Sequence, residues 1–491
     1  MKWAPEYINT ILIPGFNMMK TTFAEPMLKI SSAHVVMLHH VGILSLEDSA
    51  LILKRCEYLL KLDWKTQEYP GNVEDLFFLI EQMIEEQVGP DVAGNMHIAM
   101  SRNDLDTAMY RWVLRKEVLD LGEMLIDLRS ILLSKAYDYA QTIMPAHTHN
   151  QQAQPTTVGH YLSAVEANLA RDHQRLLQVY SRINCSPLGA CALATTGFPI
   201  DRDFTAALLG FSGLVENSYD AICTTDYMAE FIGLLGTILT TLSRFVSDLL
   251  LWATNEFDVI KLPDEFVQRS SIMPQKRNPS GLEHLRAHIG RAIGKLGSFY
   301  TTVKGIPFGD AVDSGDDIQP VLRGLWGDTS SILRLLTSIL QGIRVNERVL
   351  WERTCQGFSV ITELADALAR SGLSFREAHK IASLAVDKLF QEGSTLPELT
   401  LSDLDTICID QFGKPSGLTK EAFQQAIDPS FFVETRRVAG GPSSDVLLPC
   451  IERADKRIEV NKHDIWSLHQ ELHEGDQLLN NGIAAILKGG N

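Results

Sequence analysis

The stretch from Ser270 to Asn278 carries side chains well suited to chemistry: two hydroxyls, an ammonium group and a carboxamide. Prolines at 274 and 279 predict a loop, because proline fixes φ and removes a backbone donor. Either Ser270 or Ser271 could act as a base that removes a proton from a carbon next to a carboxylate. Lys276 and Asn278 could bind that carboxylate as negative charge grows on it in the transition state. The alternative is an ordinary solvated surface loop.

A second polar segment, Ser101-Arg102-Asn103-Asp104, precedes a long helical pattern. Arg102 offers a forked donor for a carboxylate, and Ser101 and Asn103 add hydrogen-bonding groups. The same residues could instead cap the helix that begins near Asp104. Both roles are compatible, since the N-terminus of a helix binds anions.

The third polar segment, residues 145–157, is predicted to be a loop, and it contains His147 and His149 among neutral polar side chains. Their spacing could suit a metal, but no Cys, Asp or Glu lies nearby to complete the ligand shell. We therefore expect no metal, and a histidine that handles a proton or a hydrogen bond. Glu283, on the helix after the first loop, could orient such a histidine. It could equally be a solvated helix glutamate.

Helical periodicity dominates the chain, with apolar residues recurring every three or four positions. It predicts long helices over residues 104–140, 157–181, 227–254, 280–303 and 321–345. Such lengths indicate an all-α fold built around a bundle of long helices. The helix over 227–254 has few charges and is apolar on most sides, so it must be buried on most sides. It lies either in a symmetric oligomer or at the centre of one large bundle.

At 491 residues the chain is too long for one simple core. We expect three units: residues 1–100 with short helices and loops, 101–355 with the long helices, and 356–491 with shorter helices and a polar tail, where residues 456–479 form an outer helix. The net charge of −17 argues against nucleic acid or an anionic membrane as the main partner.

The seven cysteines are scattered and none forms a CxxC pair, which indicates reduced thiols and a cytoplasmic protein. The longest tempting apolar segment, residues 231–243, is shorter than the run of about 20 residues that a membrane span needs. We therefore expect it to belong to a buried helix.

The three polar segments occur in the order expected of the fumarase/aspartase superfamily, and the chain resembles its argininosuccinate lyase family. The resemblance covers roughly residues 90–442. Its motifs are Ser101-Arg102-Asn103-Asp104, Thr148-His149 with Gln152-Ala153-Gln154-Pro155 and Gly159-His160-Tyr161, Ser270 through Pro279, Pro187-Leu188-Gly189, Phe198 through Arg202, Phe375 through His379, and Asp428-Pro429 through Gly440-Gly441.

The resemblance implies a three-domain fold and a homotetramer with a core of about 20 helices and active sites assembled from three subunits. It places the catalytic serine at Ser270 and the carboxylate-binding, charge-stabilising residues at Lys276 and Asn278. It pairs His149 with Glu283 in catalysis. The remaining substrate-binding positions it implies are Ser101, Arg102 and Asn103 for the succinyl part, with Thr148, Gln154, Ser271 and Met273.

The chemistry implied by the resemblance is reversible anti β-elimination of an N-substituted L-aspartate, such as argininosuccinate, to fumarate and an amine. Ser270, as an alkoxide, would remove a Cβ proton, and positive groups would stabilise the resulting aci-carboxylate. Closure of the 261–281 loop would exclude water. The resemblance implies no cofactor, no metal and a small-molecule substrate as the partner.

Several positions depart from the family pattern and bear on which amine leaves. Met100 precedes the first motif, Arg269 replaces a glycine before the serines, and Thr225 replaces an arginine. An ungapped comparison puts Asp310, Gly315 and Ile318 where the family has Tyr, Gln and Lys.

We hypothesise an altered amine specificity, in which four aspartates favour a cationic amine: Asp310, Asp313, Asp316 and Asp317. Argininosuccinate itself stays open as the substrate. A non-catalytic, crystallin-like structural protein of the same family is the alternative class.

Overall fold

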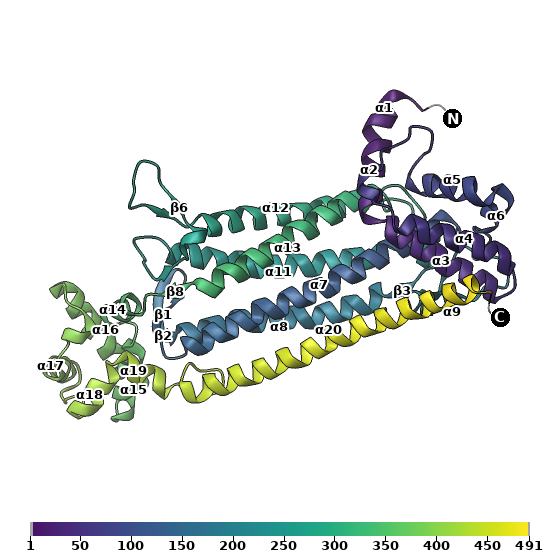
Figure 1. The fold of residues 1–491 in the computed structure, drawn as a ribbon. Coiled ribbons are helices and arrows are strands. Elements are labelled where there is room, and N and C mark those ends of the chain that lie inside the picture. Colours follow the sequence, from purple (N-terminus) through teal and green to yellow (C-terminus); the bar gives the residue numbers. More distant parts are fainter. Residues whose placement is uncertain (1–2, 490–491) are drawn as a thin grey trace.

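The computed structural model describes residues 3–489 and is mainly α-helical. Long helices form an elongated bundle (Figure 1): α7 (Arg102–Asp138), α8 (Val158–Ile183), α11 (Asp226–Trp252), α12 (Ser280–Val303) and α13 (Gln319–Gly342). Each bound lies within three residues of the one predicted from periodicity. The predicted helical bundle is confirmed.

Helix α11 packs against α8 and α12 in the centre of the bundle. Its residues Phe231, Leu235 and Leu239 are fully buried. By length and composition α11 is apolar enough to cross a membrane, and its buried face accounts for that composition. Its other face exposes small residues, among them Gly233 and Thr240, so the single chain covers α11 on one side only.

Short helices gather at one end of the bundle, next to the start of α7 (Figure 1). They are α1 (Pro5–Tyr7), η1 (Ile8–Leu12), α2 (Ile13–Thr22), α3 (Ala24–His40), α4 (Leu46–Leu60), η2 (Trp64–Thr66), α5 (Leu76–Val88), α6 (Pro90–Asn95), α9 (Arg202–Leu208) and α10 (Ser218–Cys223). Most of them share a hydrophobic core with the first turns of α7 and the last turns of the C-terminal helix.

Another helical group lies at the opposite end (Figure 1). It consists of α14 (Glu347–Gln356), α15 (Ile361–Arg370), α16 (Phe375–Glu392), η4 (Leu396–Glu398), α17 (Leu401–Phe412), α18 (Lys420–Ala426) and α19 (Pro429–Thr435). From there α20 (Ser444–Leu487) runs back along the whole bundle, which makes it longer than the expected outer helix over 456–479. The three predicted domain boundaries stay predictions.

Short strands within the connecting segments form two-stranded pairs. Antiparallel pairs are β1 (Ile143–Thr148) with β2 (Gln151–Thr157), β5 (Ile260–Lys261) with β8 (Arg344–Val345), and β6 (Gln268–Arg269) with β7 (Arg277–Asn278). The pair β3 (Cys185–Ser186) with β4 (Gly213–Leu214) is parallel. A single turn, η3 (Asp264–Phe266), precedes β6.

The segment 145–157, expected to be a polar loop, is instead a β-hairpin. Thr148 pairs with Gln151 across a two-residue turn made of His149 and Asn150. Both turn residues have positive φ, 52° and 59°, which is the geometry that matches the twist of a tight hairpin. The sequence lacks the Asn-Gly pair that usually signals such a turn, so the expectation of a loop was wrong.

Candidate active site

The three predicted segments lie at two opposite ends of the bundle. Arg102 begins α7, whereas β1 starts just after α7 ends. Helix α7 has 37 residues, so its ends are separated by roughly 55 Å at 1.5 Å per residue. Residues 268–278, which we call the serine hairpin, lie at the same end as β1 and β2 (Figure 1). A single chain therefore keeps Arg102 far from both Ser270 and His149.

Within the serine hairpin, the hydroxyl of Ser270 is held by backbone donors. The N–H groups of Ile272 and Met273 donate to Ser270 Oγ at 3.2 and 3.0 Å. Two donors aimed at one oxygen stabilise an alkoxide more than a neutral hydroxyl. Ser271 is exposed and follows at the tip of the hairpin. The arrangement favours Ser270 over Ser271 as the base.

The cations of the serine hairpin divide into two groups. Arg277 donates a hydrogen bond to Asp264, which lowers the pKa of the Asp264 carboxyl group, and Arg269 Nη2 lies 3.7 Å from Asp264 Oδ2. Arg269 is thereby paired with a surface carboxylate. Lys276 is exposed and joins no ion pair within residues 3–489. Asn278, on β7, is half-buried, and Met273 is exposed.

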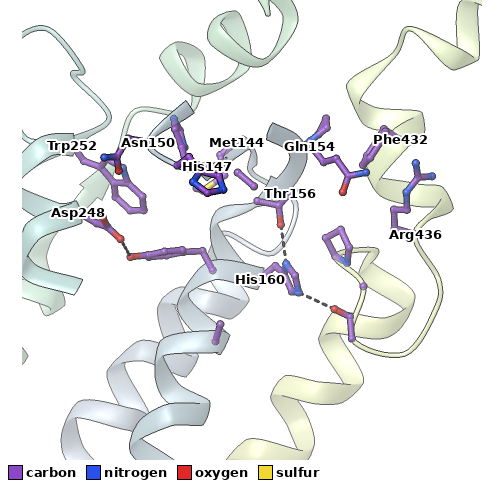
Figure 2. A pocket seen from close by; sticks show the side chains of 18 of the residues that line it. Met144, His147, Asn150, Gln154, Thr156, His160, Asp248, Trp252, Phe432 and Arg436 are labelled. Atoms are coloured by element: carbon purple, nitrogen blue, oxygen red, sulfur yellow. Dashed lines mark hydrogen bonds between the residues drawn. The ribbon is translucent and has the colours of Figure 1, made fainter. Parts of the chain in front are cut away.

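Beside the β1–β2 turn lies a cavity of about 850 Å³, which we call the hairpin cavity (Figure 2). His147, His149 and Gln154 line it from the hairpin, and residues 438–442 line it from the C-terminal segment. His149 holds a positive φ of 52°. Such a conformation is uncommon for a residue with a side chain and often marks a functional position. Thr148 precedes it and is exposed.

A hydrogen-bonded histidine fixes the wall of the hairpin cavity (Figure 2). His160 Nε2 lies 2.9 Å from Gly440 O, and His160 Nδ1 lies 2.8 Å from Thr156 Oγ1. Because a carbonyl only accepts, Nε2 carries the proton and Nδ1 accepts from the Thr156 hydroxyl. Tyr161 donates to Asp248 Oδ2 at 2.5 Å. Two family motifs far apart in sequence, at 159–161 and 440–441, thus meet here.

Glu283 lies in the first turn of α12 and is exposed. Among residues 3–489 it forms neither a hydrogen bond nor an ion pair with His149. The two residues are therefore not paired within one chain. Their predicted pairing stays a prediction and would require a second chain.

At the other end of the bundle, Ser101 caps α7. Ser101 Oγ accepts from the Asn103 N–H at 3.3 Å, and Asp104 Oδ1 accepts from the Ser101 N–H at 2.9 Å. Asp104 Oδ2 also accepts from the N–H groups of Gly189 and Cys191. Burial raises the pKa of Asp104 to about 6 despite these donors. The helix-cap alternative is thus realised, and it leaves an anion-binding role of the same N-terminus available.

Arg102 faces carboxylates on two elements. Its Nη2 lies 2.7 Å from Asp75 Oδ2 and 3.6 Å from Asp106 Oδ2. It lines a cavity of about 280 Å³, which we call the acidic cavity. The other lining residues are Glu74, Asn103, Asp106, Thr107, Tyr110, Ile222, Thr224, Tyr227, Met228, Asp310, Ala311, Val312, Ser314, Gly315 and Asp316.

Only two of the four aspartates that the sequence analysis grouped together line the acidic cavity. Asp310 and Asp316 line it, whereas Asp313 and Asp317 do not. Ile318 is fully buried at the start of α13, so it cannot contact a ligand there. Sequence reasoning missed Asp106, although its position four residues after Arg102 places both on one helix face. Nothing in the sequence marked Tyr110 or Tyr227.

Comparisons with known proteins agree with one another. Residues 39–294 match a lyase family model, and residues 358–434 match the argininosuccinate lyase C-terminal family. The chain is 36% identical to argininosuccinate lyase of Methanosarcina barkeri over 89% of its own length and 88% of the relative's. It is 35% identical to argininosuccinate lyase 1 of Shouchella clausii, with 94% and 93% covered. The crystal structure of an EDDS lyase in complex with formate superposes with a TM-score of 0.87 at 31% identity, covering 99% of this chain and 97% of that one.

Proposed function

This chain belongs to the argininosuccinate lyase family and is a carbon–nitrogen lyase that releases fumarate. From that premise, we propose that it eliminates an amine from an N-substituted L-aspartate, with Ser270 as the general base. The observation that carries the choice of base is the pair of backbone N–H groups that donate to Ser270 Oγ. Serine is a weak base at its ordinary pKa, so its alkoxide needs such donors.

The proposed reaction takes a proton from Cβ of the aspartate to the Ser270 alkoxide. The electron pair of the C–H bond passes to the neighbouring carboxylate and forms an aci-carboxylate with two negative charges. Lys276, a cation without an ion pair among the described residues, and Asn278 would hold that charge. The pair then returns to form the C=C bond of fumarate as the Cα–N bond breaks.

The departing amine needs a proton, and His149 is the proposed donor. Anti elimination puts the acid and the base on opposite faces of the substrate, so they must come from different elements. His149 lies on the β1–β2 turn and Ser270 on the serine hairpin. Glu283 from the first turn of α12 would orient the imidazole and stabilise its protonated form. In the reverse direction His149 would receive the proton from the attacking amine.

The remaining positions would bind the substrate carboxylates and exclude water. Ser101, Arg102 and Asn103 lie at the N-terminus of α7, where unpaired backbone N–H groups and the guanidinium both favour an anion. The serine hairpin would close over the substrate and bring Ser271 and Met273 to it, while Thr148 and Gln154 would contact the substrate from the β1–β2 hairpin.

We further propose that the active protein is a cytoplasmic homotetramer whose sites are shared between chains. Two observations support the shared site. Arg102 and Ser270 lie at opposite ends of the bundle. Helix α11 also leaves a face of small residues uncovered, with a groove lined by Gly233, Gly236, Thr237 and Thr240 among others. Small residues let a second helix approach closely, and an antiparallel neighbour would bring the two ends together.

The test is an amine screen in the addition direction, with excess fumarate, one amine per well and ultraviolet absorbance of fumarate as the readout. We expect fumarate to be consumed with at least one amine and the rate to fall by roughly 10³-fold in Ser270→Ala. Ser271→Ala is the comparison, and we expect it to lose much less. Equal losses in both variants, or full activity in Ser270→Ala, would contradict the assignment of Ser270 as the base.

A further inference from the structure

The acidic cavity is unbalanced in charge. Its lining carries the carboxyl groups of Glu74, Asp106, Asp310 and Asp316 against one guanidinium, that of Arg102. Arg102 is already paired at 2.7 Å with Asp75, which stands behind the lining. The positive charge of Arg102 is therefore largely matched by Asp75 and Asp106 before any substrate arrives. The carboxyl groups of Glu74, Asp310 and Asp316 have no cationic partner among the residues that line the cavity.

Three buried polar atoms of lining residues also lack hydrogen-bond partners among residues 3–489: Arg102 Nε, which only donates, and two atoms that can accept. The hydroxyl of Tyr227, a residue only 2% exposed, has no hydrogen-bond partner within residues 3–489. The same holds for Asp106 Oδ1, although Asp106 Oδ2 faces Arg102 at 3.6 Å. Buried polar atoms are normally hydrogen-bonded, so a pair of unpartnered ones on one cavity points to a missing polar group. Both atoms can accept from an ammonium group, which donates in three directions.

The acidic cavity is lined by two chemically different groups of residues. Arg102 and Asn103 belong to the helix N-terminus that would hold the succinyl carboxylates, and Asp310 and Asp316 line the cavity from a different element, the loop before α13. Asp316 Oδ1 is held by the Tyr110 hydroxyl at 3.2 Å. A ligand that matches both groups has carboxylates at one end and a cation at the other.

We propose that the leaving amine of this lyase is a diamine or polyamine, whose second, distal ammonium group binds between Asp106 and Asp316 in the acidic cavity. The substrate is then an N-succinyl diamine, negative at its aspartate end and positive at its far end. Asp106 and Asp316 are its specificity-determining residues. This inference rests on the proposed function, since it takes Arg102 and Asn103 as the succinyl side of the site.

The same cavity disfavours an amino acid as the leaving amine. The α-carboxylate of an amino acid would enter a space lined by the carboxylates of Glu74, Asp310 and Asp316, where like charges repel at short range. The part of the loop that lines the cavity carries no cation: Gly315 has no side chain, Ile318 is fully buried, and Lys304, at the start of the loop, is not a lining residue. A Cβ at Gly315 would meet the Tyr110 hydroxyl at 3.5 Å, an ordinary contact, so this wall of the cavity lies close to Tyr110.

The experiment compares three amines with matched carbon chains in the addition reaction: cadaverine, pentylamine and lysine. We expect kcat/KM for cadaverine to exceed that for the other two by at least about tenfold, as one charge-assisted hydrogen bond predicts. In Asp106→Asn and in Asp316→Asn the ratio of cadaverine to pentylamine should fall towards one. Asp316→Asn alters an exposed residue at the cavity mouth, so a folding defect of Asp106→Asn does not spoil the test.

Asp313→Asn is the matched control, because Asp313 belongs to the same loop but does not line the cavity. It should keep the preference for cadaverine. Equal rates with cadaverine and pentylamine in the unaltered enzyme, or a preference for lysine, would overturn the proposal. So would a loss of preference in Asp313→Asn as large as that in Asp316→Asn.

A binding measurement separates this proposal from the proposed function. Calorimetry would titrate cadaverine into the enzyme in the presence of succinate, which resembles fumarate but cannot react. If no amine consumes fumarate, the proposed function fails, yet cadaverine binding that weakens at least about tenfold in Asp316→Asn still supports the cavity. Absent binding, or binding unchanged in Asp316→Asn, would overturn the diamine site.

Discussion

Ser270 differs from its neighbour Ser271 by the two backbone N–H groups that reach its oxygen. Both donors belong to residues 272 and 273 of the same hairpin, so local backbone geometry, more than any side chain, would prepare the alkoxide. The carboxylate-binding cation, Lys276, lies on the same hairpin and would move with it. Base and charge-stabilising groups would therefore arrive at the substrate together.

The donor from residue 273 can be removed without touching the serine. Met273→Pro deletes the N–H that lies 3.0 Å from Ser270 Oγ. We expect kcat to fall by roughly 10²-fold, the usual cost of one donor at a developing negative charge. Met273→Ala keeps the N–H and removes the side chain, so it controls for lost substrate contacts. Equal kcat values in the two variants would show that this donor does not activate Ser270.

We expect the Asp106 carboxyl group to lower the free energy of unfolding at neutral and alkaline pH. Burial raises its pKa to about 8, with Asp316, Asp75 and Asp310 adding to the rise and Arg102 opposing it. A carboxyl group whose pKa is raised by folding binds its proton more tightly in the folded state. Its contribution to the free energy of unfolding is therefore largest at acid pH and is lost as the pH rises towards about 8.

Asp106→Asn removes that dependence. We expect its melting temperature, relative to the unaltered protein, to rise between about pH 5 and about pH 8, the window set by the raised pKa. Asp313→Asn, an exposed residue outside the cavity, should show no such trend. If Asp106→Asn tracked the unaltered protein over the whole range, Asp106 would not hold a buried proton. A gain in stability together with weaker cadaverine binding would mark Asp106 as a functional residue.

The residue types of the candidate site were predictable, but their surroundings were not. The hydroxyls, cation and carboxamide of residues 270–278 are visible in the sequence, as is the forked donor Arg102. The pairing of Arg102 with Asp75 was not, because Asp75 caps a different helix, α5, and meets α7 only through the fold. The unpartnered hydroxyl of Tyr227 likewise depends on packing against α7 and carries no sequence signal.

Among the elements, the β1–β2 turn stores strain at the proposed catalytic histidine. His149 and Asn150 both hold positive φ, which is unfavourable for residues with a Cβ, although less so for Asn than for most others. The turn holds the backbone of His149, which lines the hairpin cavity. A change in the second turn residue should therefore act on catalysis through His149.

Asn150→Val should destabilise this turn by about 1–2 kcal/mol, because a β-branched residue tolerates positive φ poorly. Asn150→Gly keeps the conformation accessible and is the matched control. We expect kcat to fall in Asn150→Val and to stay close to normal in Asn150→Gly, measured alongside urea unfolding. Equal kcat in both variants would mean that the turn does not position a catalytic group.

Long helices were the easiest elements to predict. Each has a sustained period of three to four residues, and α12 begins and ends where the pattern does. The hairpin β1–β2 escaped prediction because its seven-residue second strand is polar, with Gln at three positions, and its alternation is not a hydrophobic one. Its structure comes from pairing and from a turn that only backbone geometry reveals.

At the scale of the whole molecule, the uncovered face of α11 should be an interface. Thr240 is exposed on that face and lines its groove. Thr240→Arg would place a charge where a second helix must approach closely, so the assembly should dissociate and activity should be lost with it. Size-exclusion chromatography with light scattering measures the mass. Ser402→Arg, exposed on α17 at the end of the molecule, is the control and should leave the mass unchanged.

The sequence predicted that α11 is buried on most sides, in an oligomer or at the centre of one bundle, but it could not show where the site residues lie. Arg102 and His149 are only 47 positions apart, yet a straight helix holds them at opposite ends of the bundle. Closeness in the sequence therefore did not mean closeness in space, and the order of the motifs gave no information on the distances between them. The proposal of a shared site rests on the length of α7.

The most direct test of the account mixes two inactive chains. Arg102→Ala and Ser270→Ala would each be purified, shown to be inactive, dissociated together and reassembled at equal amounts. If each site takes Arg102 from one chain and Ser270 from another, random reassembly gives about a quarter of the sites both intact residues, and roughly a quarter of normal activity returns. If each site is built from one chain, the mixture stays inactive, and the shared active site proposed here is wrong.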